Sequence, residues 1–425
     1  MILSAVAFAA LLLLGLPVGF VMLGATVAYF AQNPMTASIV AQRLSSGLES
    51  FPLLAIPLFV VAGAAMARGG IADRLYAFCE TLVGHWRGGL AQIAVLNSVF
   101  MGAMSGSANA DAAIDARTIV PVMRKRGYSN AYGSVISAAS SLIAPVMPPS
   151  IALIIYGLLT DTSIGKLFVG GIIPAFIIAT ALMLTVRWTA IRMNLAPARK
   201  TRAGPGEVLS NGRAALWALA MPVMLLFGLR GGWFTPTELG AVAAAYAFLV
   251  GTLVYRGIKP SDMSSLLAEA TMTTAGVMFI VASASVFSLI LSLEQIPQAL
   301  IGGLLAISDN PLIVLLVVNI ALLILGTVFD GLAIIVILGP LLTQVAATLG
   351  IDPVHLGVVL VFNTAIGSLT PPVGTVMFTV CSITRCSVED FTKSFLPFLL
   401  ALIGVLLLLT FVPPLVTFLP NLLYR

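Results

Sequence analysis

Long apolar segments recur along almost the whole chain, and they limit the possible folds more than any other feature. The first of them, residues 2–30, contains no charged residue. A helix needs about 20 apolar residues to cross the hydrocarbon core of a bilayer. Only 9% of the residues are charged, whereas a soluble domain carries roughly a quarter. We therefore expect an all-α, multi-pass membrane protein embedded in a lipid bilayer.

The first apolar segment is too long for the core of a signal peptide and has no basic residues before it. We therefore predict that it is a retained membrane helix. Two shorter segments, 107–122 and 331–348, are expected to enter the membrane without crossing it cleanly. Further apolar elements are expected at 51–67, 88–104, 130–159, 167–190, 213–229, 237–255, 270–292, 311–328, 354–380 and 394–419.

A basic linker near the middle of the chain indicates an organisation in two halves. Residues 191–212 are polar, contain proline and glycine, and carry several arginines and a lysine. Basic loops of membrane proteins usually face the cytoplasm, so this linker is predicted to be cytoplasmic. The first half would then be residues 1–190 and the second half residues 213–425.

Recurring prolines indicate that the two halves are repeats. The double proline Pro148-Pro149 recurs as Pro371-Pro372, an offset of 371 − 148 = 223 residues. The same offset relates Pro174 to Pro397. Because proline removes a backbone donor and interrupts a helix, these matches mark the same backbone events in both halves.

The charges before the two double prolines predict how the repeats are oriented. Residues 124–128 are strongly basic, whereas residues 348–352, at the corresponding place before the second double proline, include no basic residue. If basic loops face the cytoplasm, the two copies enter the membrane from opposite sides. Such inverted repeats are typical of secondary transporters, which bind their substrates at mid-membrane between broken helices. We predict re-entrant hairpin tips near 105–111 and 326–331, and broken helices near 144–150 and 363–374.

Two polar segments of the first half are candidates for ion or substrate binding. Residues 105–111 combine small hydroxyl residues with glycine, asparagine and aspartate, and their oxygens could face a cation such as Na⁺. The alternative is a stripe of small residues that packs two helices together. Residues 144–150 contain three prolines, so their free carbonyls need either a bound ligand or a neighbouring protein donor.

The second half has corresponding candidates around one isolated acid. Asp330 is the only ionisable residue between Asp309 and Asp352, and an acid in such an apolar segment is a functional candidate. It could also cap the helix that begins at Gly331, and both roles can coexist. The densest cluster of polar side chains in this half lies within residues 363–374.

Two further acids leave their role open. Asp111 and Asp115 are four residues apart, so they share one face of a helix, and Arg117 is close in the sequence. They could form an ion cluster with this arginine at the cytoplasmic end of the helix, or they could contact substrate.

Several of these segments resemble one known family, the DctM-like large membrane subunit of TRAP (tripartite ATP-independent periplasmic) transporters. The resemblance runs from near residue 1 to the C-terminus, and its unusual motifs occur in the family's order. It is carried by Leu54–Gly70, Gly102–Ala116, Ala144–Ser150, Ile296–Pro311, Leu349–Gly357 and Asn363–Gly374.

The resemblance implies an elevator-type transporter in the bacterial inner membrane, with a mobile transport domain held by a scaffold. It implies Na⁺ as the coupling ion and no other cofactor. The implied partners are a separate, small four-helix membrane subunit and a periplasmic solute-binding protein. The implied substrate is an organic anion, such as a C4-dicarboxylate or a sialic acid.

The resemblance also implies where ions and substrate bind, with the substrate between the two tips. The breaks differ between the halves, so the two ion sites are expected to differ in their ligands. Candidate Na⁺ ligands are Ser105, Ser107, Ala144 and Met147 in the first half, and Gly326, Asp330, Gly367, Ser368 and Thr370 in the second. Candidate substrate-binding residues are Ser105, Asn109, Asp111, Asn363 and Thr364.

Other functional classes fit the sequence less well. A membrane enzyme is not expected, because the chain has no HExxH pair, no GxSxG elbow and no clustered histidines. The net charge of +5 comes from basic residues scattered at helix ends, so nucleic acid is not an expected partner. A channel would need a ring of pore-lining groups from several subunits. The nearest alternative is a stand-alone cation-coupled anion transporter of related architecture.

Overall fold

The computed structural model describes residues 2–32 and 37–424, and this part of the chain consists of helices and their connections, without a strand. Seven of its helices are long and apolar enough to span a membrane. An eighth span is counted if α14 (Ile296–Ile307) and α15 (Pro311–Gly326), which meet at a bend of 117°, form one unit. The predicted all-α, polytopic fold class is confirmed.

The helix boundaries repeat at the offset that the prolines indicate. Helix α7 (Ala108–Lys125) matches α16 (Gly331–Thr348) at both ends, because 331 − 108 and 348 − 125 are both 223. Helix α8 (Asn130–Ser141) begins 353 − 130 = 223 residues before α17 (Pro353–Gly367). The two halves therefore build the same sequence of elements from largely different residues.

Each half contains a helical hairpin. In the first, α6 (Gly89–Ser105) leads into α7 through only Gly106 and Ser107. In the second, α15 leads into α16 through residues 327–330. Gly106 has a φ of +59°, a conformation that glycine adopts without the steric penalty of a side chain. The two hairpins that the sequence predicts are present, with tips inside the predicted ranges.

Each half also contains a helix that is broken at its double proline. Helix α8 ends at Ser141, and α9 (Ile151–Leu159) begins after nine intervening residues, 142–150. Helix α17 ends at Gly367, and α18 (Thr375–Thr384) follows after residues 368–374. Prolines within these segments remove backbone donors, so a continuous helix cannot form there.

The first apolar segment does not form the single helix that its length predicts. It forms α1 (Ile2–Leu13) and α2 (Val18–Gln32), which pack against each other. The chain reverses at Gly15, whose φ is +76°, and Pro17 then precedes the start of α2. Apolar composition alone did not reveal this turn, because leucines surround the glycine and the proline.

The linker between the halves is shorter than predicted. Helix α10 (Ile164–Arg192) ends two residues inside the predicted linker, and α11 (Pro205–Arg230) begins before its end. Pro205 is the first helical residue of α11, where its missing N–H is not needed. The non-helical part is therefore residues 193–204, and Arg199 within it forms an ion pair with Glu207 at 2.7 Å.

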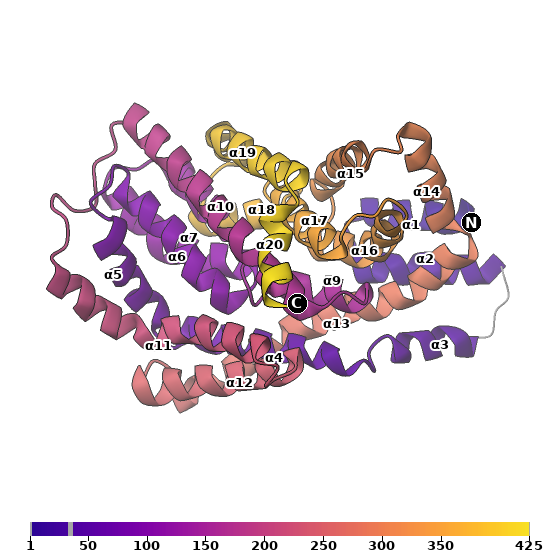
Figure 1. Ribbon diagram of the computed structural model, residues 1–425, viewed down its shortest axis with the longest axis horizontal. Helices are drawn as coiled ribbons and strands as arrows, with labels where there is room; N and C mark the ends of the chain where they lie inside the picture. The colour runs from indigo at the N-terminus through magenta and orange to yellow at the C-terminus, as the bar shows by residue number, and fades with distance from the viewer. Residues whose placement is uncertain (1, 33–36, 425) are drawn as a thin grey trace.

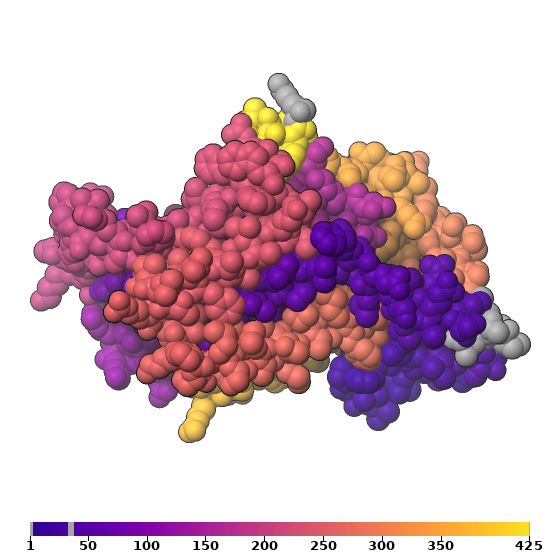
Figure 2. Space-filling view, turned by 90° about the horizontal axis from the view of Figure 1, so that it is seen from below, coloured from indigo at the N-terminus to yellow at the C-terminus, as the bar shows by residue number. Residues whose placement is uncertain are grey.

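One side of the molecule is formed by helices outside the hairpins and broken helices. Helices α3, α4, α11, α12 and α13 lie together at the bottom of Figure 1. The space-filling view from that side shows mainly α11, α12 and the N-terminal helices (Figure 2). We call α4, α11, α12 and α13 the scaffold side. The remaining bounds are α3 Ala37–Ser46, η1 Phe51–Leu54, α4 Ala55–Arg68, α5 Ile71–Val83, α12 Pro236–Leu249, η2 Val250–Val254, η3 Pro260–Asp262, α13 Met263–Leu293, α19 Val388–Phe411 and α20 Pro414–Leu423.

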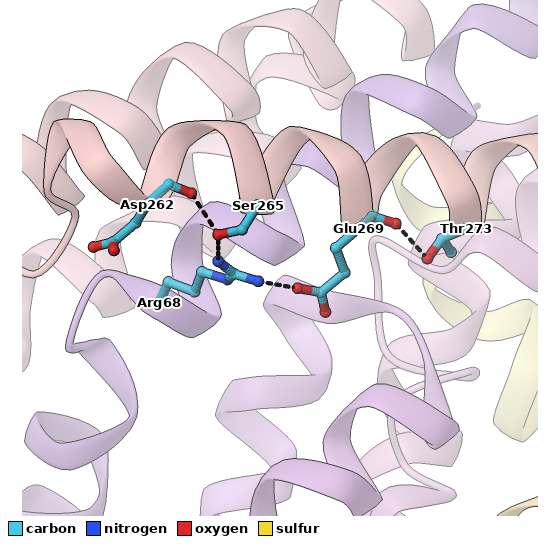
Figure 3. Close-up of polar contacts among 5 residues, drawn as sticks. All are labelled: Arg68, Asp262, Ser265, Glu269 and Thr273. Carbon is cyan, nitrogen blue, oxygen red and sulfur yellow. Dashed lines mark hydrogen bonds and ion pairs between the residues drawn. The ribbon is translucent and has the colours of Figure 1, made fainter.

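A polar contact joins the scaffold helices of the two halves. Arg68, the last residue of α4, donates hydrogen bonds to Ser265 and to the carboxylate of Glu269 on α13 (Figure 3). One turn further along α13, the Thr273 hydroxyl donates to the Glu269 carbonyl at 3.0 Å. The contact holds the end of α4 beside the part of α13 that leads to the central cavity described below.

Candidate transport site

Both hairpin tips and both helix breaks meet at one cavity of about 120 Å³. The scaffold side contributes to its wall through Thr273 and Val277 of α13. Of the residues that the sequence predicts as ligands, the cavity is lined by Ser107, Asn109, Asp330, Thr364 and Ser368. The structure thus brings polar groups from both halves, far apart in the sequence, to one place.

Four helices begin at this cavity. Ala108, Ile151, Gly331 and Thr375 line it, and they are the first residues of α7, α9, α16 and α18. The N-terminus of a helix carries a partial positive charge and unpaired backbone N–H groups, so it favours an anion. Among the described residues, the cavity therefore combines four positive helix ends with hydroxyl groups and one carboxylate, that of Asp330.

In the first half, the hairpin tip rests against the helix break by backbone contact. A Cβ atom on Gly106 would lie 2.4 Å from the carbonyl oxygen of Pro149, and one on Gly102 would lie 2.8 Å from the Cα of Ala144. Such distances leave no room for a side chain at either glycine. Backbone carbonyls of the break are thereby held beside the tip at Ser105–Ser107.

The second half repeats this arrangement with glycine on both sides. A Cβ atom on Gly367 would lie 2.5 Å from the Cα of Gly326, and one on Gly326 would lie 2.8 Å from the Cα of Gly367. The backbone N–H of Val373 donates to the carbonyl of Thr327 at 2.9 Å. The tip and the break are therefore held together by contacts and a hydrogen bond between main-chain atoms.

Asp330 occupies two environments at once. It is the N-cap of α16, and its carboxylate accepts a hydrogen bond from the Leu332 N–H at 3.0 Å. It also lines the cavity. Asp330 therefore has the capping role that the sequence suggests. The same residue is also part of the cavity wall.

Other sequence-predicted residues do not line the cavity. Asp111 and Asn363 are fully buried elsewhere, so in this conformation neither contacts a solute in the cavity. Thr370 directs its hydroxyl to the carbonyl of Ile366 at 3.1 Å, within its own helix turn. The predicted residues outside the lining are Ser105, Asp111, Ala144, Met147, Gly326, Asn363, Gly367 and Thr370.

Asn363 belongs instead to a buried polar network. Its amide donates to Asn319 Oδ1 at 2.9 Å and to the Asn319 carbonyl at 3.0 Å. The Asn319 amide in turn donates to Thr410 Oγ1 at 2.8 Å. This network joins the second hairpin to α17 and α19, and the only sequence signal for Asn319 was that of a single amide in an apolar helix.

The ion cluster considered for Asp111, Asp115 and Arg117 is not formed. Both acids are fully buried, whereas Arg117 is exposed. Asp115 instead accepts hydrogen bonds from Asn97 and Ser98 on α6, each at 3.3 Å. The i, i+4 spacing correctly places both acids on one face, but that face is turned towards the protein and away from Arg117.

Sequence reasoning missed two hydroxyl groups of the cavity. Thr375 directly follows the predicted break, and its buried hydroxyl has no hydrogen-bond partner among the described residues. A hydroxyl residue directly after Gly374, at the end of the predicted break, could have indicated that Thr375 belongs to the site. Thr273 lies within a long apolar helix, and only the packing of α13 against the hairpins brings it to the cavity.

Comparisons with known proteins agree with this geometry. Residues 5–415 match the family described as "Tripartite ATP-independent periplasmic transporter, DctM component". The chain is 38% identical to the 2,3-diketo-L-gulonate TRAP transporter large permease protein YiaN of Escherichia coli, over 95% of each chain. It is 39% identical to the C4-dicarboxylate TRAP transporter large permease protein DctM of Pseudomonas aeruginosa, over 92% of this chain and 91% of that one.

A solved structure shares the fold at low sequence identity. The YdaH transporter of Alcanivorax borkumensis aligns with a TM-score of 0.63 and 18% identity, covering 96% of this chain and 98% of that one. The helical fold, the paired hairpins and the close relatives describe a membrane transport protein and not an enzyme. The chain belongs to the DctM family, the large permease component of tripartite ATP-independent periplasmic transporters.

Proposed function

We propose that this permease imports a small organic anion with Na⁺ as the coupling ion. The observation that carries the proposal is the convergence of four helix N-termini on one cavity between the two hairpin tips. Positive helix ends can hold a carboxylate without an arginine, and cation sites at the tips would offset its charge. Two of the relatives are named for 2,3-diketo-L-gulonate and C4-dicarboxylate, which supports an organic acid, such as a dicarboxylate, a sialic acid or a similar carboxylate.

The proposed Na⁺ sites lie where each tip meets its break. In the first half they would use Ser105, Ser107 and the backbone near Ala144 and Met147. In the second half they would use Asp330 and Ser368 with the backbone of Gly326 and Gly367. Oxygen ligands from hydroxyl, carbonyl and carboxylate groups suit a hard cation, and the close backbone contacts hold these oxygens in place.

The movement we propose is of the elevator type. The hairpins and broken helices would move together past the scaffold side, since the cavity is enclosed almost entirely by the former. Thr273 and Val277 of α13 close the cavity on the scaffold side. Movement of the hairpins along α13 would replace this wall by an opening to one side of the membrane.

The proposed partners follow from family membership. A periplasmic solute-binding protein would deliver the anion, and a small four-helix membrane subunit would complete the permease in the bacterial inner membrane. The test is uptake of radiolabelled organic acids into proteoliposomes that hold the chain with its candidate small subunit. We expect uptake only with both a Na⁺ gradient and the binding protein. Uptake by the chain alone would replace this proposal by a stand-alone carrier.

The second Na⁺ site gives a prediction that separates two neighbouring hydroxyl residues. Ser368 lines the cavity, whereas Thr370 does not, and both hydroxyls donate to carbonyls of their own helix turn. Replacing Ser368 by alanine is expected to raise the Na⁺ concentration for half-maximal uptake by about tenfold, the effect of losing one ligand worth about 1.4 kcal/mol.

Thr370→Val serves as the matched control and is expected to change this concentration by less than about threefold, since a hydroxyl outside the cavity loses only a local bond worth about 0.5 kcal/mol. The measurement is the Na⁺ dependence of uptake at fixed substrate concentration. A change of less than about threefold in both variants would show that neither hydroxyl contributes directly to the ion site, and a tenfold change in both would add Thr370 to it.

A further inference from the structure

Two carboxylates are buried in the stem of the first hairpin, away from the central cavity. Asp111 and Asp115 lie in the first and second turns of α7, and each has an exposed fraction of 0%. Neither lines the central cavity. The proposed transport mechanism therefore leaves both of these acids without a role.

The surroundings of the pair hold more acceptors than donors. Asp115 accepts from the Asn97 amide and the Ser98 hydroxyl. Both oxygens of Asp111 and Oδ1 of Asn97 are buried without a hydrogen-bond partner among the described residues. No lysine, arginine or histidine of the described chain forms an ion pair with either acid. The buried pair thus includes three orphaned acceptors, namely the two carboxylate oxygens of Asp111 and the amide oxygen of Asn97.

The repeat shows that the hairpin does not need these acids in order to fold. The counterparts of Asp111 and Asp115 in the second hairpin are Ile334 (111 + 223) and Leu338 (115 + 223). These apolar residues occupy the same register of α16, which has the same length as α7. Burying an unpaired charge is unfavourable by several kcal/mol, and the second hairpin shows that packing at this register does not require an acid.

We infer that Asp111, Asp115, Asn97 and Ser98 form a further Na⁺ site in the stem of the first hairpin. A single shared proton would satisfy at most two of the three orphaned acceptors, whereas a hard cation takes several oxygen ligands at once. Mg²⁺ is less suitable, because it usually keeps several of its waters and this site is tightly enclosed. Hydrogen bonds from Asn97 and Ser98 to Asp115 stabilise the second negative charge.

A second cavity lies beside the site and shares Asn97 with it. It has a volume of about 150 Å³, and Asp73, Tyr76, Asn97 and Thr118 are among the residues that line it. Asp73 is exposed, whereas Asn97 is buried and donates to Asp115 at 3.3 Å. Only the Asn97 side chain would have to move for a cation in this cavity to approach Asp115, so we place the entrance to the proposed site here and not at the central cavity.

The site rests on the proposed Na⁺ coupling and extends it by one ion. Both acids belong to the hairpin that forms the tip at Ser105–Ser107. A bound ion would therefore link α6 to α7 and would move together with this hairpin. The transported charge per cycle would then increase by one positive charge over what the two tip sites provide.

The test is the number of ²²Na⁺ ions bound per purified chain, together with its small subunit, in scintillation proximity measurements. The double variant Asp111→Ile/Asp115→Leu places the residues of the second hairpin at the site. We expect it to bind one ion fewer than the parent chain and to melt at a higher temperature in Na⁺-free buffer. Asp111→Asn alone, which keeps shape and polarity, is expected to lose the same ion.

Asp161→Asn is the control, because Asp161 is an exposed loop acid outside both cavities, and it should bind as many ions as the parent. An unchanged ion number in both pair variants, with Na⁺ still bound by the parent, would overturn this inference alone. A parent chain that binds no Na⁺ would overturn the proposed coupling as well.

Discussion

Replacing Gly367 by valine is expected to reduce uptake to below roughly a hundredth of the parent rate, the scale of loss that a displacement of about 1 Å at a site can cause. The Cβ atom would lie 2.5 Å from the Cα of Gly326 and 3.0 Å from its carbonyl oxygen. These are backbone atoms of the neighbouring hairpin, so they cannot rotate away as a side chain would. The tip would be pushed off the break, and the ion site and cavity wall that they share would both be displaced.

The same variant should also lower thermal stability moderately. Overpacking of a closely packed interior costs about 1–3 kcal/mol, which is less than the loss expected for transport. Gly404→Ala is the control, because Gly404 lies in α19 and a Cβ atom added to it would meet no neighbouring atom within 4 Å. Near-normal uptake by Gly367→Val would show that the two backbones separate without functional consequence.

Asp330→Asn is expected to lower uptake at least about tenfold at limiting Na⁺, the effect of losing about 1.4 kcal/mol of ion binding, while the protein remains folded. Asparagine caps a helix about as well as aspartate, so the bond from Leu332 N–H is retained and only the negative charge is lost. Among the described residues, Asp330 is the one carboxylate that lines the central cavity. We therefore expect a higher Na⁺ concentration for half-maximal uptake, measured in proteoliposomes with the binding protein present.

Asp352→Asn provides a matched control for this experiment. Asp352 also caps a helix, accepting from the N–H groups of Val354 and His355 at the start of α17, but it does not line the cavity. Its amide variant should keep the parent's Na⁺ dependence. Asp330→Ala should lose the cap as well, lowering stability by about 1 kcal/mol. An unchanged Na⁺ response in Asp330→Asn would remove this carboxylate from the ion site.

Much of the fold could be predicted because its signals are local. Apolar length identifies membrane helices, and prolines and glycines mark where a helix must stop or turn. The double prolines predicted both breaks, and the polar segments around Gly106 and Asp330 predicted both tips. The prediction failed at residues 2–30, because a turn at Gly15 inside an otherwise apolar segment has little effect on hydropathy.

The candidate site could be predicted only in part. The sequence identified the segments that meet at the cavity, since polar and helix-breaking residues are rare in an apolar chain. It did not distinguish which side chains face the cavity. Asn109 and Thr364 line it, whereas Asp111 and Asn363 are turned into other helix contacts. Such orientation depends on how a helix is rotated against its neighbours, which involves residues far away in the chain.

By itself, the sequence determined the class of protein, because long apolar segments are stable as helices in lipid. It also determined the repeat and the position of both helix breaks of the site, because proline removes a backbone hydrogen-bond donor. Only the tertiary structure decided that four helix N-termini share one cavity and that Thr273 of the scaffold side closes it. It alone showed that Asp111 and Asp115 are buried without a counter-charge among the described residues. Packing between distant segments sets these relations, and no local pattern of residues encodes them.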